Sequence, residues 1–176
     1  MCLILYGAPL SPFVRKVEVL LREKGAEFES EPVNIMPMPD WFKEISPAKR
    51  IPVLRDLSVG REGPKGTIAD SSAICAFAER KFSEPALYPA DAFELGRATW
   101  YEEWADTELA GKVGMGIFRP ILFPRFQGKE SDIPAAKKRG TRVCLRSSTT
   151  SKANWRARNF WWGVRSPSPI FRWLAR

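Results

Sequence analysis

The feature that most constrains this chain is an apolar run at residues 3–6, which ends in a turn rich in glycine and proline and leads into a helical pattern. An apolar run of this length, bounded by such a turn, predicts a short buried strand. The apolar residues that follow share one helical face, at spacings of i, i+4, i+7 and i+8: Phe13, Val17, Leu20 and Leu21. The segment therefore predicts a strand, a loop and an amphipathic helix that stops near Gly25.

Ser11 stands where this helix begins. Pro12 follows it at the first helical position, an arrangement typical of a helix N-terminus. The unpaired backbone N–H groups and the positive end of the helix dipole favour an anion at such a place. Taken alone, a serine here more often serves only as an N-cap, so a binding role needs support from the rest of the chain.

The elements after the first helix are predicted from weaker patterns. In order they are a strand over residues 27–33, a short helix capped by Asp40, a strand after Pro52, a long polar hairpin loop over 57–66, the end of a strand at 67–69, and a helix opened by Asp70. The order βαβ followed by ββα predicts an α/β domain over residues 1–84.

A linker over residues 85–89 is predicted to lead into a second region that is all-helical. A long helix is expected from Asp91, followed by a looser stretch that contains Pro120 and Pro124. Residues 85–138 are therefore interpreted as a partial helical domain.

The composition of the 176 residues excludes several kinds of chemistry. The chain has no histidine, which rules out Ser-His-Asp hydrolysis and histidine-based general acid–base catalysis. Cys2, Cys75 and Cys144 are too few and too far apart to indicate a disulfide framework or a metal site. No run approaches the roughly 20 apolar residues of a membrane span, and the N-terminus lacks a signal-peptide pattern. A cytoplasmic protein without a metal or a membrane partner is expected.

Three motifs at fixed spacings carry a family resemblance: Ser11-Pro12-Phe13-Val14, Ile51-Pro52-Val53-Leu54 and Asp70-Ser71-Ser72-Ala73-Ile74. Each motif alone is weak, but together they resemble the serine-type, bacterial-like cytosolic glutathione transferases over about residues 3–132. The resemblance implies a thioredoxin-like N-terminal domain with a cis peptide bond before Pro52, followed by an all-α domain. It also implies glutathione as cosubstrate, a small electrophile as substrate, and a homodimer in intact members.

By this resemblance Ser11 is the catalytic residue, which donates a hydrogen bond to the glutathione sulfur and lowers the pKa of the thiol. The residues that the resemblance assigns to glutathione binding are Arg50, Ile51, Pro52, Val53, Asp70 and Ser71. Arg50 lies where many members carry a lysine for the glycyl carboxylate, and a solvated loop cation explains it equally well. Omega-like members and glutaredoxins carry a cysteine at the Ser11 position, so thiol–disulfide exchange is disfavoured here.

The resemblance implies that Asp70 and Ser71 hold the γ-glutamyl end of glutathione and that the backbone of Val53 pairs with its cysteinyl unit. A helix cap explains Asp70 equally well from the local sequence.

The C-terminal part differs from the rest of the chain, because residues 133–176 contain no acidic residue. If the codons for residues 160–163 are read one base earlier, they must encode Leu-Val-Gly, because tryptophan has a single codon. In the same shifted frame, the possible codons for residues 166–171 can encode Ser-Ile-Ala-Asp, a motif of the family's helical domain. We therefore interpret residues 139–176 as a poorly ordered, out-of-frame basic tail, with the frame change near residues 136–142. A truncated helical domain of this kind predicts weak or absent activity and argues against the dimer.

Two other function classes stay open at this point. A non-catalytic interaction module would keep the same fold without needing Ser11. Taken at face value, the basic tail with its interleaved tryptophans could instead bind nucleic acid or an acidic membrane surface. Nucleic-acid binding is disfavoured, because translation of a GC-rich gene in a shifted frame yields many arginines, serines and tryptophans without any selection for binding to a partner.

Overall fold

The computed structural model describes residues 2–140. The predicted out-of-frame tail therefore lies outside the described residues, apart from its first two positions. The chain divides into two compact units, one that extends to Glu103 and one that starts at Trp104. The domain boundary expected after residue 84 stays a prediction from the sequence.

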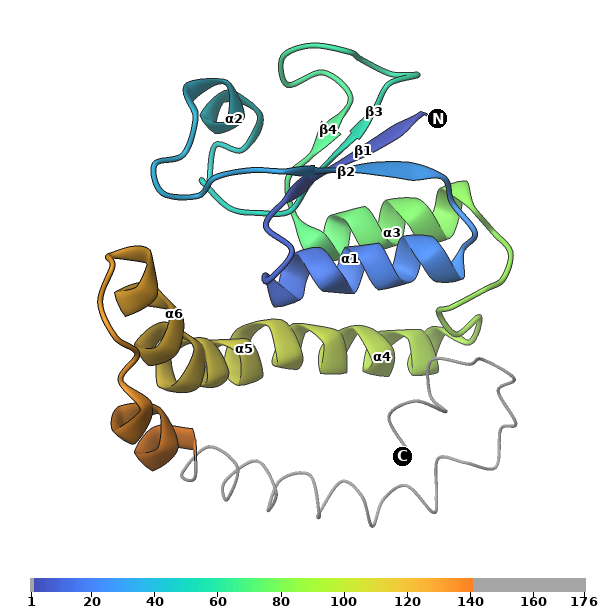
Figure 1. Cartoon of the computed structure of the whole chain (residues 1–176). Coiled ribbons are helices and arrows are strands. Elements are labelled where there is room, and N and C mark those ends of the chain that lie inside the picture. The colour runs from blue at the N-terminus through green and yellow to red at the C-terminus, as the bar shows by residue number, and fades with distance from the viewer. Residues whose placement is uncertain (1, 141–176) are drawn as a thin grey trace. The chain divides into compact units, whose positions relative to one another are not determined.

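The first unit contains a sheet of four strands in the order β2-β1-β3-β4 (Figure 1). The strands are β1 (Leu3–Gly7), β2 (Phe28–Pro32), β3 (Val53–Asp56) and β4 (Thr67–Ile68). β1 pairs in parallel with β2 and antiparallel with β3, and β3 pairs antiparallel with β4. β2 forms an outer edge of the sheet, where Glu29 and Glu31 are exposed.

Helices cover both faces of the sheet. Helices α1 (Pro12–Glu23) and α3 (Ser71–Lys81) lie side by side on one face, and α2 (Asp40–Ile45) lies on the other (Figure 1). Because successive side chains of a strand point to opposite faces, β1 contributes to two cores. The buried residues on the α1–α3 side are Leu3, Leu5, Val14, Val17, Leu20, Leu21, Leu54, Ile74, Cys75 and Ala78. Those on the α2 side are Tyr6, Val33, Phe42, Ile45 and Val53.

The element order β1-α1-β2 followed by β3-β4-α3 confirms the predicted βαβ–ββα arrangement, which is a thioredoxin-like fold. Helix α1 ends before Gly25, whose φ of 63° suits glycine at a helix C-terminus. The prediction that Asp40 caps the short helix is wrong, because Pro39 occupies the cap and Asp40 is the first helical residue.

The loop after β3 is built on two buried charged residues. Arg55 donates hydrogen bonds to the backbone oxygens of Gly63 at 2.8 Å and Lys65 at 3.2 Å. Asp56 accepts hydrogen bonds from Ser58 and from Lys81 of α3. The predicted polar hairpin loop at residues 57–66 is therefore a compact structure with a buried polar base.

Helix α4 (Ala92–Trp104) follows the linker, and its residues up to Glu103 belong to the first unit. The second unit is helical. It contains the π-helical segments Ala105–Leu109 and Gly114–Phe118, helices α5 (Ala110–Val113) and α6 (Arg119–Phe126), and a helical stretch over residues 133–140.

The stretch expected to be loose around Pro120 and Pro124 is helical instead. Pro120 lies in the first turn of α6, where a missing backbone N–H costs little, whereas Pro124 lies inside the helix. Within residues 2–140, no helix combines the length and apolar character needed to cross a membrane.

Candidate functional site

The residues predicted to form a site gather at one edge of the sheet. β1 and β4 end at this edge and β3 begins there, because β3 runs antiparallel to both neighbours. Ser11 follows β1, Pro52 directly precedes β3, and Asp70 follows β4. The topology thus brings together three segments that are far apart in the sequence.

Ser11 occupies the N-cap of α1 with an extended backbone. Its side-chain oxygen accepts a hydrogen bond from the N–H of Val14 at 3.5 Å, a long and therefore weak contact. The hydroxyl acts there as an acceptor, so its own hydrogen can still be donated to a ligand. Gly7 permits the close approach of α1 to β1, since a Cβ at this position would lie 2.5 Å from Cγ2 of Val14.

The Ile51–Pro52 peptide bond is cis, as the resemblance leads us to expect. Val53 pairs with Tyr6 of β1 and its side chain is buried in the core on the α2 side. A role of Val53 in ligand binding therefore falls to its backbone.

Asp70 and Ser71 form the N-terminus of α3. Asp70 is the N-cap, and its Oδ1 accepts a hydrogen bond from the N–H of Ala73 at 3.0 Å. A carboxylate has about four lone-pair sites, so capping leaves capacity for a further donor. Ser71 is buried at the first helical position, whereas Asp70 is exposed.

Arg50 is exposed at the end of the turn that leads to Pro52. The backbone of Arg50 is held by the buried hydroxyl of Ser46, which the sequence analysis did not single out. The signal that could have revealed Ser46 is its place between the apolar Ile45 and Pro47, where a serine often bonds to the backbone of a turn.

A polar network that the sequence analysis also missed links α1, α3 and α4. Nζ of Lys16 lies 2.6 Å from Oε1 of Glu102 and 3.2 Å from Oγ of Ser72. The hydroxyl of Ser72 donates to Glu103 at 2.8 Å, and that of Tyr88 donates to Glu102 at 2.6 Å. Burial, followed by the hydrogen bond to Glu102, raises the pKa of Tyr88, so the phenol stays a neutral donor. The network attaches the helices that carry Ser11 and Ser71 to α4.

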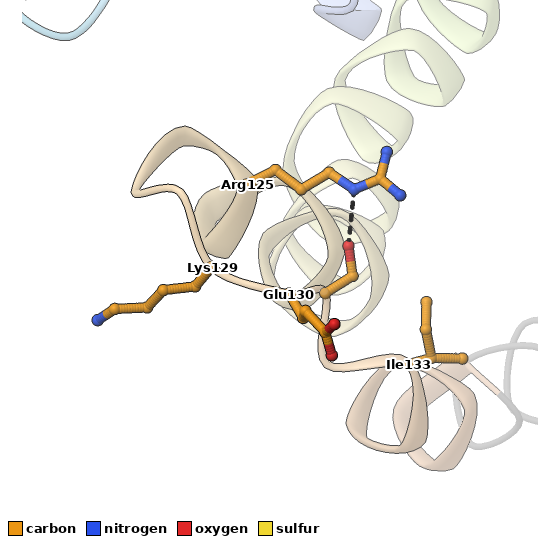
Figure 2. Close-up of a pocket in the computed structure, with 5 residues that line it drawn as sticks. Arg125, Lys129, Glu130 and Ile133 are labelled. Carbon is orange, nitrogen blue, oxygen red and sulfur yellow. Dashed lines mark hydrogen bonds between the residues drawn. The ribbon is translucent and has the colours of Figure 1, made fainter.

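The second unit has a surface pocket of about 430 Å³ beside the end of α6 (Figure 2). Its lining residues are Arg125, Lys129, Glu130, Ser131 and Ile133. Nε of Arg125 donates a hydrogen bond to Oγ of Ser131 at 3.0 Å, as the dashed line in Figure 2 marks. No predicted site residue lines this pocket, so the motifs at the sheet edge remain the better candidate site. In the described part of the chain, no group of three or more His, Cys, Asp or Glu side chains could hold a metal ion.

The family model for "Glutathione S-transferase, N-terminal domain" matches residues 5–86. A glutathione S-transferase of Triticum aestivum is 36% identical over 88 residues, which make up 50% of this chain and 38% of that relative. Glutathione S-transferase omega-1 of Mus musculus is 28% identical over 93 residues, 52% of this chain and 36% of that relative. The chain spans a quarter to a half of the length of the curated relatives it matches.

A solved structure has the same fold. A glutathione S-transferase from Rhodospirillum rubrum superposes with a TM-score of 0.71 at 26% identity, over 82% of this chain and 62% of that one. The thioredoxin-like topology and the match of the family model together identify residues 5–86 of this chain as a glutathione S-transferase N-terminal domain.

Proposed function

We propose that this chain binds glutathione and transfers it, through its sulfur, to a small electrophile, with Ser11 activating the thiol. The observation that carries the proposal is the gathering of Ser11, the segment 51–53 and the Asp70–Ser71 pair at one edge of the sheet. These three segments offer a donor for the sulfur, a strand backbone for the middle of the tripeptide, and a helix N-terminus for its γ-glutamyl end.

The role of Ser11 follows from the ionisation of a thiol. A thiol with a pKa near 8.5 is only a few per cent ionised at pH 7, and the thiolate is the nucleophile. The Ser11 hydroxyl would donate a hydrogen bond to the thiolate, with the positive end of the α1 dipole behind it. A fall in the thiol pKa of about two units corresponds to about 2.7 kcal/mol. The thiol proton goes to solvent, and the sulfur electron pair forms a bond to the electrophilic carbon. The bond between that carbon and its leaving group breaks at the same centre, and the leaving group departs to solvent with the bonding pair.

Recognition of the tripeptide would use complementary charges at both ends. The carboxylate of Asp70 would face the γ-glutamyl ammonium, while the Ser71 hydroxyl and the N-terminal N–H groups of α3 face the γ-glutamyl carboxylate. The backbone of Val53 would pair with the cysteinyl unit, and Arg50 would bind the glycyl carboxylate.

We also propose that the activity of this chain is weak. The proposed glutathione residues all lie in the first unit. In the family, the electrophile site depends on the helical domain, into which the predicted frame change falls. A weak turnover with retained glutathione binding is the expected combination.

The test is retention of the full chain on immobilised glutathione, followed by titration of the bound thiolate through its ultraviolet absorbance. We expect Ser11→Ala to keep glutathione binding, to raise the thiol pKa by about two units, and to lower turnover by about 10²-fold, as the loss of one transition-state donor does elsewhere. Ser11→Ala also removes an N-cap, which costs about 1 kcal/mol of stability.

Ser11→Asp is the matched control, because aspartate keeps the cap but cannot donate to sulfur when ionised. Ser11→Asp should recover the stability that Ser11→Ala loses, but it should not recover the low pKa of the glutathione thiol. Unchanged thiol pKa and unchanged function in Ser11→Ala would contradict the proposed role and favour a non-catalytic module of the same fold.

A further inference from the structure

The turn between α2 and β3 is built around one buried side chain. Ser46 is fully buried, and its hydroxyl donates a hydrogen bond to the backbone oxygen of Arg50 at 2.7 Å and accepts one from the N–H of Arg50 at 3.0 Å. The backbone of Ser46 is engaged as well, since its N–H donates to Phe42 at 2.9 Å and its oxygen accepts from Lys49 at 2.8 Å. Ser46 thus joins the end of α2 to the residue directly before Ile51.

The same turn contains a residue in the left-handed region. Lys49 has a φ of 54°, which is uncommon for a residue with a side chain. Such a backbone persists only where the surrounding contacts hold it. The contacts that close this turn are the backbone bond from Lys49 to Ser46 and the two side-chain bonds between Ser46 and Arg50.

We infer that Ser46 is a positioning residue that sets the affinity for the glycyl end of glutathione by fixing the backbone of Arg50. The Ser46 side chain is buried, so it acts through Arg50 and not by touching the ligand. The Arg50 side chain is exposed, and only its backbone is held by these bonds. Two-pronged binding of a carboxylate by a guanidinium depends on orientation, which the backbone position determines. The inference rests on the proposed function, because it takes glutathione as the ligand.

The test uses three thiols that differ at the glycyl end: glutathione, its ethyl ester at the glycyl carboxyl, and γ-glutamylcysteine. Dissociation constants are measured by calorimetry with the full chain. We expect Ser46→Ala to weaken glutathione binding about tenfold, because a hydrogen bond to a charged group is lost from its proper geometry. Binding of the ester and of γ-glutamylcysteine, which offer no glycyl carboxylate, should change by less than about twofold.

Two further variants separate positioning from folding. Arg50→Gln should weaken glutathione binding to the same degree as Ser46→Ala. The double variant Ser46→Ala/Arg50→Gln should bind glutathione no more weakly than Arg50→Gln does, since the two residues act as one unit. Ser46→Cys nearly keeps the buried volume but has a weaker hydrogen-bonding group. It should therefore lose less affinity for glutathione than Ser46→Ala does, with the same selectivity among the three thiols, and it provides this test even where Ser46→Ala fails to fold.

Lys49→Asn is the matched control in the same turn. It removes a neighbouring cation while keeping a residue that tolerates a positive φ. The ratio of the dissociation constants for glutathione and γ-glutamylcysteine should therefore not change. If the unaltered chain binds none of the three thiols, the proposed function fails and the inference fails with it. If the chain binds glutathione but Ser46→Ala and Ser46→Cys weaken all three thiols equally, Ser46 is merely structural and the inference alone is overturned.

Discussion

The carboxylate of Asp56, at the base of the loop after β3, is buried and accepts hydrogen bonds from Ser58 and Lys81. Burial raises the pKa of this carboxyl, but the bonds from Lys81 and Ser58 together outweigh burial and hold the pKa below its usual value. Because the folded-state pKa is lowered, the ionised group contributes stability above the unfolded-state pKa of about 3.9. This contribution is lost as the pH falls through the folded-state pKa.

We therefore expect Asp56→Asn to lower the free energy of unfolding at pH 7 by about 1–3 kcal/mol. The difference from the unaltered chain should shrink as the pH falls below the unfolded-state pKa and through the lowered folded-state pKa of this carboxyl. Urea titrations of both chains at several pH values measure this difference. A gap of the same size at both ends of the range would contradict the prediction.

Asp40→Asn provides the control for Asp56→Asn. The hydrogen bond and the charge of Lys43 lower the pKa of Asp40, but this carboxylate is exposed to solvent. Water and salt screen such a pair, so its removal should change stability little.

Single residues are predictable from the sequence where their partners are close in the chain. Ser11 before Pro12 is recognisable as a helix start, since the bonds of a cap join residues three apart. Arg55 is only 4% exposed, yet the sequence shows it as a polar residue in a short strand. Its partners Gly63 and Lys65 reach it only after the loop closes, so no local pattern reveals its burial.

At the scale of elements, the linker between α3 and α4 is held by a buried ion pair. Nζ of Lys24 lies 2.6 Å from Oε2 of Glu79, and it donates to the backbone oxygen of Pro85 at 2.8 Å. Oε1 of Glu79 also accepts hydrogen bonds from the N–H groups of Leu87 at 3.1 Å and Tyr88 at 3.3 Å. The Lys24 side chain is 0% exposed and that of Glu79 is 22% exposed, so the cation is the more deeply buried partner.

We expect Glu79→Gln to destabilise the first unit by about 3–5 kcal/mol, because it leaves the buried ammonium of Lys24 without a counter-charge. Lys24→Met should cost less, since it removes the fully buried charge and leaves a carboxylate that water reaches. Urea unfolding measures the order of the two variants. Hydrogen exchange at the amides of Leu87 and Tyr88 should speed up in Glu79→Gln, and the reverse order of stabilities would contradict this account.

The order of the elements could be predicted from their sequence patterns, whereas their contacts could not. The strand at residues 3–7 and the helix after Ser11 follow from apolar spacing and from the turn between them. The contact of Lys16 with Glu102 joins residues on helices far apart in the chain, and nothing in either helix specifies the other. The sequence does not predict the helix at residues 119–126, because its two prolines disfavour a helix and the apolar spacing in this segment is only weakly helical.

At the scale of the whole molecule, the two steps proposed for this chain depend on different regions. The residues proposed to bind glutathione lie between positions 11 and 71, inside the first unit. By the family resemblance, the electrophile is positioned by the helical domain, and the sequence predicts that residues 139–176 are read out of frame. Binding of glutathione and turnover should therefore respond differently to repair of the reading frame.

We expect a chain with the restored frame to turn over an activated aryl chloride at least about tenfold faster, since positioning of the second substrate governs such rates. Its dissociation constant for glutathione should change by less than about twofold. Initial rates and calorimetry on both chains measure the two quantities. Ser11→Ala in the restored chain is the control, and it should remove most of the added turnover.

Equal turnover of the two chains would contradict the expected effect of the repair. The coding DNA gives an independent check, because stop codons in the alternative frame, or its failure to encode Ser-Ile-Ala-Asp, would rule out the frame change itself.

The exposed glutamates along β2 affect how molecules of this protein associate in concentrated solution. An outer strand offers unpaired backbone groups to any strand of another molecule. If two copies aligned their β2 strands, Glu29 and Glu31 would be brought close to the same carboxylates of the second copy. Their mutual repulsion opposes growth of the sheet from one molecule into the next, so this border of the protein resists the β-linked polymerisation that leads to fibrils.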